Sequence, residues 1–225
     1  MKRSTIIFLV IIVVLVLDQW LKVHIKLSYS LGEGFYIMGQ KWAQIHFVEN
    51  KGMAFGIEMG GAAGKYALSV FRMLMVGLLG YIIYGLVKSK ESKWLIACFS
   101  LIIAGAVGNI IDSAIYGLIF SESTYHGSVA QYMPDTGGYA PFLQGKVVDM
   151  FYFPLIECNW PEWMPYVGGN SFVFFRPVFN VADAAISVGV IAILLFHRSF
   201  FTQNKKSSST ESAVSTSVIS SSEEE

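Results

Sequence analysis

Apolar residues gather in four long stretches, at about residues 5–25, 66–87, 94–117 and 178–197. Charged or turn-forming residues bound each stretch. A helix needs about 20 predominantly apolar residues to cross the hydrocarbon core of a bilayer. The pattern therefore predicts an all-α polytopic (multi-pass) membrane protein with four transmembrane helices.

The first stretch begins like a secretory signal peptide, because Lys2 and Arg3 precede an uncharged apolar run. No small-residue cleavage site follows this run, so we interpret it as an uncleaved helix. Asp18 and Lys22 lie near its end and share one helical face, so they can pair. The pair either ends the span as an interfacial salt bridge or supports a site at that membrane face.

The segments between the apolar stretches differ in character. Residues 28–58 combine turn glycines with short aromatic and β-branched runs, which predicts short strands. Residues 118–176 form a long excursion rich in proline, glycine and aromatic residues, and aromatic residues favour a membrane interface. This inserted loop could form a lid or a partner surface, or be a long loop that the fold tolerates. Residues 202–225 are rich in Ser and Thr and predict a disordered tail after one membrane domain at 1–201.

Composition narrows the possible chemistry. Hydrophobic residues make up 54% of the chain and charged residues 14%, against about 25% charged in an ordinary soluble domain. The formal net charge is zero, which gives no indication of nucleic-acid binding. Cys98 lies in an apolar stretch and Cys158 in a polar segment, so we expect no disulfide between them. No His or Cys cluster has metal-ligand spacing, and we expect neither a metal nor another cofactor.

Lysines and arginines indicate the orientation of the helices. They flank the apolar stretches at the N-terminus, at 88–93 and at 197–206, which places both termini in the cytoplasm by the positive-inside rule. Lysines in the first loop weaken this asymmetry. With four spans, one set of polar residues then converges on the outer membrane face: Asp18, Asn50, Asn109, Asp112, Asp149 and Asp183.

Asp149 and Asp183 stand among apolar neighbours near membrane segments, where an ionisable group is costly and is by default a functional candidate. Two neighbouring carboxyl groups do not ionise together easily, so one can act as an acid and the other as a base. A purely structural interpretation is also open, because Asn180 resembles a helix N-cap and Asp183 lies in the first turn. A Ser–Lys mechanism remains a further alternative.

Five sequence blocks, in order, resemble the bacterial lipoprotein signal peptidases, the signal peptidase II family. The resemblance runs from about residue 5 to residue 198. The blocks are Asp18-Gln19-Trp20-Leu21-Lys22, Asn50-Lys51-Gly52-Met53-Ala54-Phe55-Gly56, Gly105-Ala106-Val107-Gly108-Asn109-Ile110-Ile111-Asp112, Val147-Val148-Asp149-Met150 and Phe179-Asn180-Val181-Ala182-Asp183-Ala184-Ala185-Ile186.

The resemblance implies four transmembrane helices and a small extracytoplasmic β-cradle formed by the first loop, at about residues 28–58. It implies an intramembrane aspartic endopeptidase in the bacterial cytoplasmic (inner) membrane, with Asp149 and Asp183 as the catalytic pair at the outer face. It implies diacylglyceryl-modified prolipoproteins as substrates, cleaved just before the lipidated cysteine, within membrane lipid. It also implies sensitivity to globomycin-type inhibitors, and we expect a monomer. Other residues would bind substrate or support the site: Asn50, Gly52, Gly105, Asn109, Asp112, Asn180, Ala182, Asp18 and Lys22.

Two departures from the family pattern affect this expectation. Ser113 follows Asp112 where the family usually has arginine, so a partner charge is lost or another residue such as Arg176 supplies it. The segments between Asp112, Asp149 and Asp183 are also longer than in the family. Two rival functions stay open: a membrane scaffold or transport subunit with structural aspartates, and an intramembrane aspartyl peptidase of another type.

Overall fold

The computed structural model describes residues 2–51, 61–125 and 127–197. The predicted tail at 202–225 and Gly52 lie outside these residues. The helices are α1 (Arg3–Ser28), η1 (Ile37–Gly39), α2 (Gly61–Lys88), α3 (Lys93–Ile111), a π-helical turn η3 (Asp112–Tyr116), α4 (Gly117–Ile119) and α5 (Val181–Phe196). The strands are β1 (Gly34–Tyr36), β2 (Gln44–Asn50), β3 (Val147–Tyr152), β4 (Ile156–Asn159), β5 (Ser171–Phe174) and β6 (Val178–Phe179).

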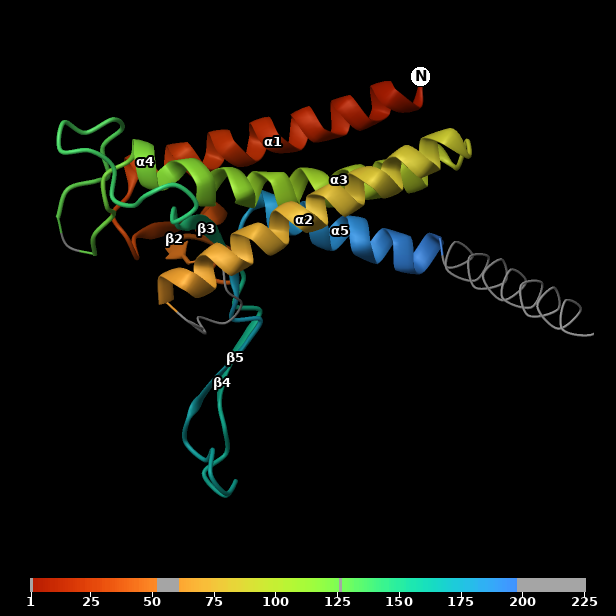
Figure 1. The fold of residues 1–225 in the computed structure, drawn as a ribbon. Coiled ribbons are helices and arrows are strands. Elements are labelled where there is room, and N and C mark those ends of the chain that lie inside the picture. Colours follow the sequence, from red (N-terminus) through yellow and green to blue (C-terminus); the bar gives the residue numbers. More distant parts are fainter. Residues whose placement is uncertain (1, 52–60, 126, 198–225) are drawn as a thin grey trace, which may run out of the picture.

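Long helices form a bundle in which α3 is central, and α1, α2 and α5 each pack against it (Figure 1). Three helical segments in the described part of the chain are long and apolar enough to cross a membrane: Arg3–Ser28, Gly61–Lys88 and Lys93–Ile119. The first three predicted spans are thus found, with somewhat longer bounds. The protein is an integral membrane protein.

The fourth predicted span, 178–197, is wrong at its start. Val178 and Phe179 form strand β6 and pair with β3, so they are not helical. Helix α5 begins at Val181 and has 16 residues, which makes it a shorter apolar helix than the other three. Apolar β-branched and aromatic residues fit a strand as well as a helix, which is why hydrophobicity alone misplaced this boundary.

A four-stranded antiparallel sheet with the order β1-β2-β3-β6 stands at one end of the bundle, here called the sheet end (Figure 1). The segment at 28–58 supplies only β1 and β2. The other two strands come from the second long segment, so the prediction of a cradle made by the first loop alone is wrong. The inserted loop at 118–176 is also more than a loop, because it contains β3, β4 and β5.

A buried apolar cluster fixes the sheet to the helices. Its members come from α1, the sheet and the end of the third span: Ile25, Ile45, Phe47, Tyr116, Phe120, Val148 and Met150. Strand β3 is buried from Val147 to Met150, so it forms the centre of this layer. The sheet therefore holds a defined position against the helix ends instead of hanging from flexible linkers.

Glycines allow α3 and α5 to approach closely. A Cβ atom at Gly105 would lie 2.2 Å from the carbonyl oxygen of Ala182, and one at Gly189 would lie 2.7 Å from that of Cys98. Small residues at such crossings let helix backbones pack without a side chain between them. By contrast, a Cβ at Gly77 on α2 would meet open space.

We predict that Gly105→Ala lowers the thermal stability of the purified protein in detergent. The added methyl group must push α5 away from α3, and overpacking of this kind costs about 1–3 kcal/mol. Gly77→Ala is the matched control and should leave stability unchanged or raise it slightly, because alanine favours a helix over glycine. Equal unfolding temperatures for the two variants would contradict this account of the α3–α5 contact.

Candidate active site

Asp149 and Asp183 reach one site from different elements. Asp149 lies in the middle of β3, where it is 4% exposed. Asp183 lies in the first turn of α5, to which β6 leads directly. Because β6 pairs with β3 through Phe151–Phe179 and Tyr152–Val178, the start of α5 is held beside the strand that carries Asp149.

Asn180 connects the two carboxyl groups. Its Nδ2 donates a hydrogen bond to Asp149 Oδ1 at 2.7 Å, and its Oδ1 accepts one from the backbone N–H of Asp183 at 2.9 Å. The Asp183 carboxylate in turn accepts the Asn180 backbone N–H, which completes a capping box. The predicted helix cap is therefore confirmed, and the same asparagine also binds the other aspartate.

Asn109 of α3 supports the pair from below. Its Nδ2 donates to Asp183 Oδ1 at 2.8 Å. Its own Oδ1 accepts from Lys22 Nζ at 3.0 Å and from Asn180 Nδ2 at 3.3 Å. Asn109 thus orients Asp183, and a buried ammonium group bound to Asn109 Oδ1 fixes the orientation of the Asn109 amide.

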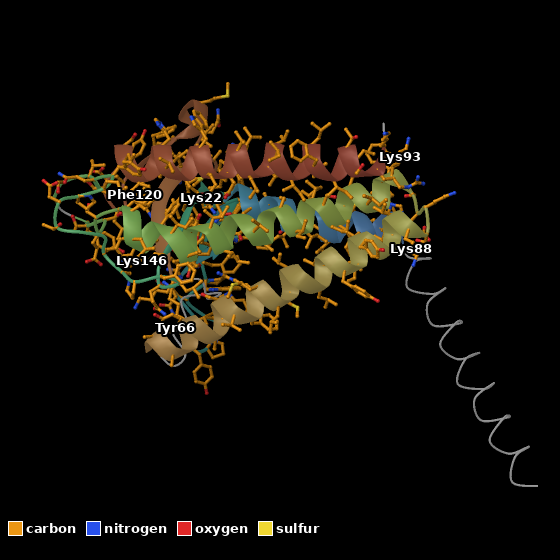
Figure 2. The ribbon with its side chains drawn as sticks, turned by 45° about the horizontal axis from the view of Figure 1, so that its top comes forward. Lys22, Tyr66, Lys88, Lys93, Phe120 and Lys146 are labelled. Atoms are coloured by element: carbon orange, nitrogen blue, oxygen red, sulfur yellow. The ribbon has the colours of Figure 1, made fainter. Side chains whose placement is uncertain are left out.

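That charge is the ammonium group of Lys22, which is 0% exposed and lies between α1 and α3 (Figure 2). Its Nζ lies 2.9 Å from Asp18 Oδ2 and 2.8 Å from Asp112 Oδ2. With the bond to Asn109, all three ammonium protons have acceptors. The predicted Asp18–Lys22 pair is confirmed, and it is a buried cluster beneath the site, not an interfacial bridge.

Gln19 and Tyr116 belong to the same cluster and were missed by the sequence analysis. Gln19 Nε2 donates to Asp112 Oδ1 at 2.9 Å and to Asp18 Oδ2 at 3.1 Å. The Tyr116 hydroxyl donates to Gln19 Oε1 at 3.2 Å. Gln19 precedes Lys22 by three positions on α1, but its partners Asp112 and Tyr116 lie far along the chain, so helical spacing alone could not have found these contacts.

A second buried ion pair lies one helical turn beyond Lys22. Lys26 pairs with Glu49 of β2, and its Nζ also donates to Ser123 Oγ at 2.8 Å. The Lys26 ammonium lies 5.5 Å from the centroid of the Phe120 ring and 5.1 Å from that of the Tyr139 ring. This pair joins α1 to the sheet and to the segment after α4, and the sequence analysis missed it too.

The Asp149 carboxyl lies in surroundings that disfavour its charge. Burial, and then the negative charge of Asp183, raise the pKa of Asp149 to about 7. The charge of Lys22 and the hydrogen bond from Asn180 act in the opposite direction and are outweighed. At neutral pH, a proton is therefore readily held on Asp149.

The other predicted residues take varied positions. Ala182 donates its backbone N–H to Asp18 Oδ1 at 2.8 Å, and Gly105 packs against the Ala182 carbonyl, so both serve the α3–α5 contact behind the pair. Asp112 Oδ2 accepts the backbone N–H of Val148, next to Asp149, at 3.3 Å. Asn50 ends β2 opposite Val147, at the edge of the site.

Ser113, which replaces the family's usual arginine, points back into its own helix and donates to the Asn109 carbonyl at 3.0 Å. Arg176 is exposed after β5. The negative charges of Asp183, Asp112 and Asp149 interact with the guanidinium group of Arg72 on α2. Positive charge near the pair therefore comes from Lys22 of α1 and Arg72 of α2, and not from a residue next to Asp112.

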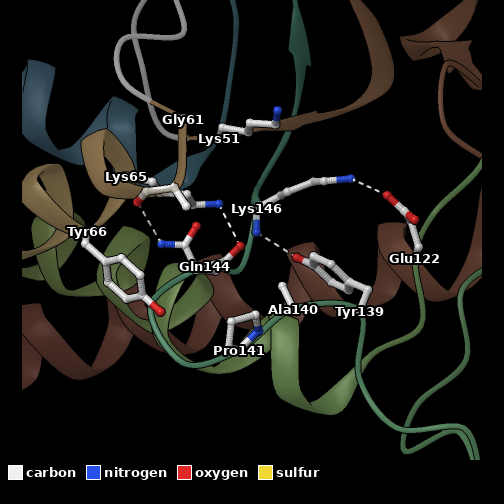
Figure 3. Close-up of a pocket in the computed structure, with 11 residues that line it drawn as sticks. Lys51, Gly61, Lys65, Tyr66, Glu122, Tyr139, Ala140, Pro141, Gln144 and Lys146 are labelled. Carbon is white, nitrogen blue, oxygen red and sulfur yellow. Dashed lines mark hydrogen bonds and ion pairs between the residues drawn. The ribbon is translucent and has the colours of Figure 1, made fainter.

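A separate cavity of about 370 Å³ lies beside the start of α2 (Figure 3). Three lysines line it, Lys51, Lys65 and Lys146, and Lys65 Nζ donates to the Gln144 carbonyl at 2.7 Å. Neither aspartate lines this cavity, so its size does not mark the reactive centre. In the part of the chain that the structure describes, no group of three or more His, Cys, Asp and Glu residues could hold a metal ion.

Comparison with known proteins shows the family of this chain. The family model described as signal peptidase (SPase) II matches residues 10–200. The chain belongs to the signal peptidase II family.

Cys98 and Cys158 are both free, as predicted.

Curated relatives carry the name lipoprotein signal peptidase. One from Porphyromonas gingivalis is 48% identical over 196 residues, which cover 87% of this chain and 84% of the relative. One from Amoebophilus asiaticus is 35% identical over 190 residues, which cover 84% and 75%. Two solved structures of a bacterial membrane enzyme share the fold, each with a TM-score of 0.53, at 21% and 22% identity. They cover 84% of this chain and 85% and 90% of their own chains.

We predict that Lys22→Met strongly destabilises the protein. Removing one partner of a buried ion pair leaves uncompensated charge, here on Asp18 and Asp112, at a cost of about 3–5 kcal/mol. Lys88→Met, at the exposed end of α2, is the matched control. Thermal unfolding in detergent measures both variants, and equal stability of the two would rule out a structural role for the buried ammonium.

Proposed function

We propose that this protein is an intramembrane aspartic endopeptidase that removes signal peptides from diacylglyceryl-modified prolipoproteins. It cuts just before the lipidated cysteine. The observation that carries the mechanism is the joining of Asp149 and Asp183 by Asn180, with the two carboxyl groups in unlike surroundings. The family relatives, named lipoprotein signal peptidases, support the substrate class.

Asp183 acts as the base in this mechanism. It is half-buried at the N-terminus of α5, where the helix dipole favours a carboxylate, and it accepts a hydrogen bond from Asn109. From this position it takes a proton from a water molecule that attacks the scissile carbonyl carbon. No covalent enzyme intermediate forms.

Asp149 acts as the acid. Its raised pKa keeps it protonated near neutral pH, so it can donate to the carbonyl oxygen as the tetrahedral intermediate forms. The C–N bond then breaks as the proton taken by Asp183 passes to the leaving amine. One hydroxyl group of the intermediate returns its proton to Asp149, which leaves the carboxylic acid product and restores both aspartates. Asn180 and Asn109 are positioning residues that hold the two carboxyl groups in these roles.

The location of the site suits a lipid-linked substrate. The pair lies where α3 and α5 meet the sheet, at the edge of the membrane-spanning segments. A signal helix and the acyl chains on its cysteine would both arrive within the bilayer, so the bond between them is reached at that depth. We infer four spans, with α5 as the fourth, and a monomer as the working unit.

The charge distribution supports the proposed orientation in the bacterial cytoplasmic membrane. Arg3 donates to the carbonyls of Lys90 and Glu91, which brings the N-terminus and the α2–α3 turn together as one basic end. At the sheet end, Lys26 pairs with Glu49 and Lys146 pairs with Glu122, which offsets part of the positive charge there. Both termini would therefore be cytoplasmic and the aspartate pair would be at the outer face.

We predict that Asp149→Asn and Asp183→Asn each abolish cleavage of a diacylglyceryl-modified prolipoprotein by the purified protein. Each change removes a proton donor or acceptor but keeps the size of the side chain. Asp135→Asn, an exposed carboxyl in the segment before β3, is the control and should cleave normally. The wild type should leave an unlipidated substrate intact and should be inhibited by globomycin.

Each possible outcome distinguishes one rival function or mechanism from the proposed one. Activity that survives in either variant would remove the aspartate pair and favour a Ser–Lys mechanism. Cleavage of the unlipidated substrate would favour an aspartyl peptidase of another type. A protein that folds and never cleaves would favour the scaffold or transport subunit.

We predict that the cleavage rate falls as pH rises through about 7, because Asp149 must keep its proton to act as the acid. Well above pH 7 the fall should approach about tenfold per pH unit. The pKa of Asp149 is higher in the folded protein than in the unfolded chain. The stability that Asp149 contributes is therefore fully present at a pH below the pKa of an ordinary carboxyl group, and it is lost as the pH rises through about 7. Unfolding should therefore be measured at each pH, and a rate that stays constant to pH 9 in the folded protein would show that Asp149 is not the acid.

A further inference from the structure

An arm made of β4 and β5 separates the two catalytic elements along the chain. Strand β3, which carries Asp149, ends at Tyr152, and β4 begins at Ile156. Strand β5 ends at Phe174, and β6 then leads to Asn180 and α5. The arm is thus inserted between β3 and β6, the two strands that hold Asp149 and Asp183 beside each other.

The pairing register makes the arm amphipathic. Ile156 lies opposite Phe174 and Cys158 opposite Phe172, and the Trp160 ring packs on Phe172 at a centroid distance of 5.0 Å. Directly opposed residues share a face and neighbours along a strand alternate, so these five side chains form one apolar face. The other face carries Asn159, Ser171 and Val173.

The apolar face leaves large hydrophobic side chains exposed, which is unfavourable in water. Ile156 is 56% and Phe174 is 51% exposed, and at the tip Trp163 is 80% exposed. An isolated two-stranded hairpin is at best marginally stable in water. A surface of this kind needs an apolar or interfacial medium to cover it.

The direction of the arm indicates which medium that is. In Figure 1 the arm leaves the bundle near the sheet end and runs across the helix axes. Since those helices span the membrane, a segment that crosses them runs along the membrane plane. Tryptophan and tyrosine are enriched at the lipid–water interface, and residues 155–175 include both, with Glu157 and Glu162 as their only charged residues.

We propose that the β4–β5 arm lies in the lipid–water interface at the sheet end, with its apolar face towards the acyl chains. Insertion depends on apolar and aromatic side chains, so it needs no anionic lipid. An aromatic cluster of Phe151, Phe153, Phe175 and Phe179 connects the base of the arm to β3 and β6. An anchored arm therefore fixes the depth of the strand pair that positions Asp149 and Asp183.

The test compares the two faces of the arm in the full-length protein, one copy per phosphatidylcholine nanodisc. A spin label is attached to the native Cys158 in a Cys98→Ala background. The matched probe is attached to Asn159→Cys with Cys158→Ser in the same background. Accessibility to lipid-soluble oxygen is then measured against accessibility to a water-soluble nickel complex.

The proposal expects an oxygen-to-nickel accessibility ratio several-fold higher at position 158 than at 159. Two labels that are both open to nickel would place the arm in water and overturn the proposal. Two labels that are both shielded from oxygen and nickel would place it in a protein contact, which also overturns it. None of these readings depends on peptidase activity, so the proposed function and the arm are tested separately.

The consequence for catalysis rests on the proposed function and uses a matched pair of charge insertions. Phe174→Glu puts a charge on the apolar face and should lower the cleavage rate in nanodiscs several-fold, with the label at 158 becoming open to nickel. Ser171→Glu puts the same charge on the polar face and should leave both readouts unchanged. A Phe174→Glu variant that leaves the bilayer but cleaves at the wild-type rate would overturn the role in positioning the pair.

Discussion

The buried ammonium group of Lys22 is the interaction on which the site depends. It pairs with both Asp18 and Asp112 and orients Asn109, and through these three residues it reaches every element that builds the site. Asp18 holds the start of α5 by the Ala182 N–H, and Asp112 holds β3 by the Val148 N–H. Burial of such a cluster is favourable only when each charge is paired and each proton has an acceptor, so its geometry is narrowly defined.

The Lys22 cluster holds the two aspartates in different surroundings, which explains how two similar carboxyl groups can take different roles. Asp149 is enclosed in the central strand of a buried layer, and its one described amide donor is Asn180. Asp183 stands at a helix N-terminus with donors from Asn109 and from the capping backbone N–H. The first environment favours a proton on Asp149, and the second offers hydrogen-bond donors to the carboxylate of Asp183. The proposed division of labour between acid and base rests on this difference in surroundings.

The same arrangement explains why a long insertion is tolerated between Asp149 and Asp183. The β4–β5 arm leaves after Tyr152 and returns before Val178, and these two residues are partners in the β3–β6 ladder. An insertion whose two ends are already held together costs little in loop closure. It leaves the Asn180 bridge undisturbed while adding a new surface at the membrane.

The sequence alone determined the membrane class, three of the helices, and the residues of the aspartate pair and its asparagines, because long apolar runs and short polar blocks are local signals. It also predicted the Asp18–Lys22 pair, since helical spacing places the two on one face. The start of α5 and the origin of half the sheet were decided by tertiary structure. Val178 and Phe179 are strand residues only because β3 offers them a partner, and such pairing joins segments far apart in the chain. Likewise, Gln19, Tyr116 and the Lys26–Glu49 pair acquire their roles only when α1, α3 and the sheet meet, since a side chain's partners are set by packing and not by its neighbours in sequence.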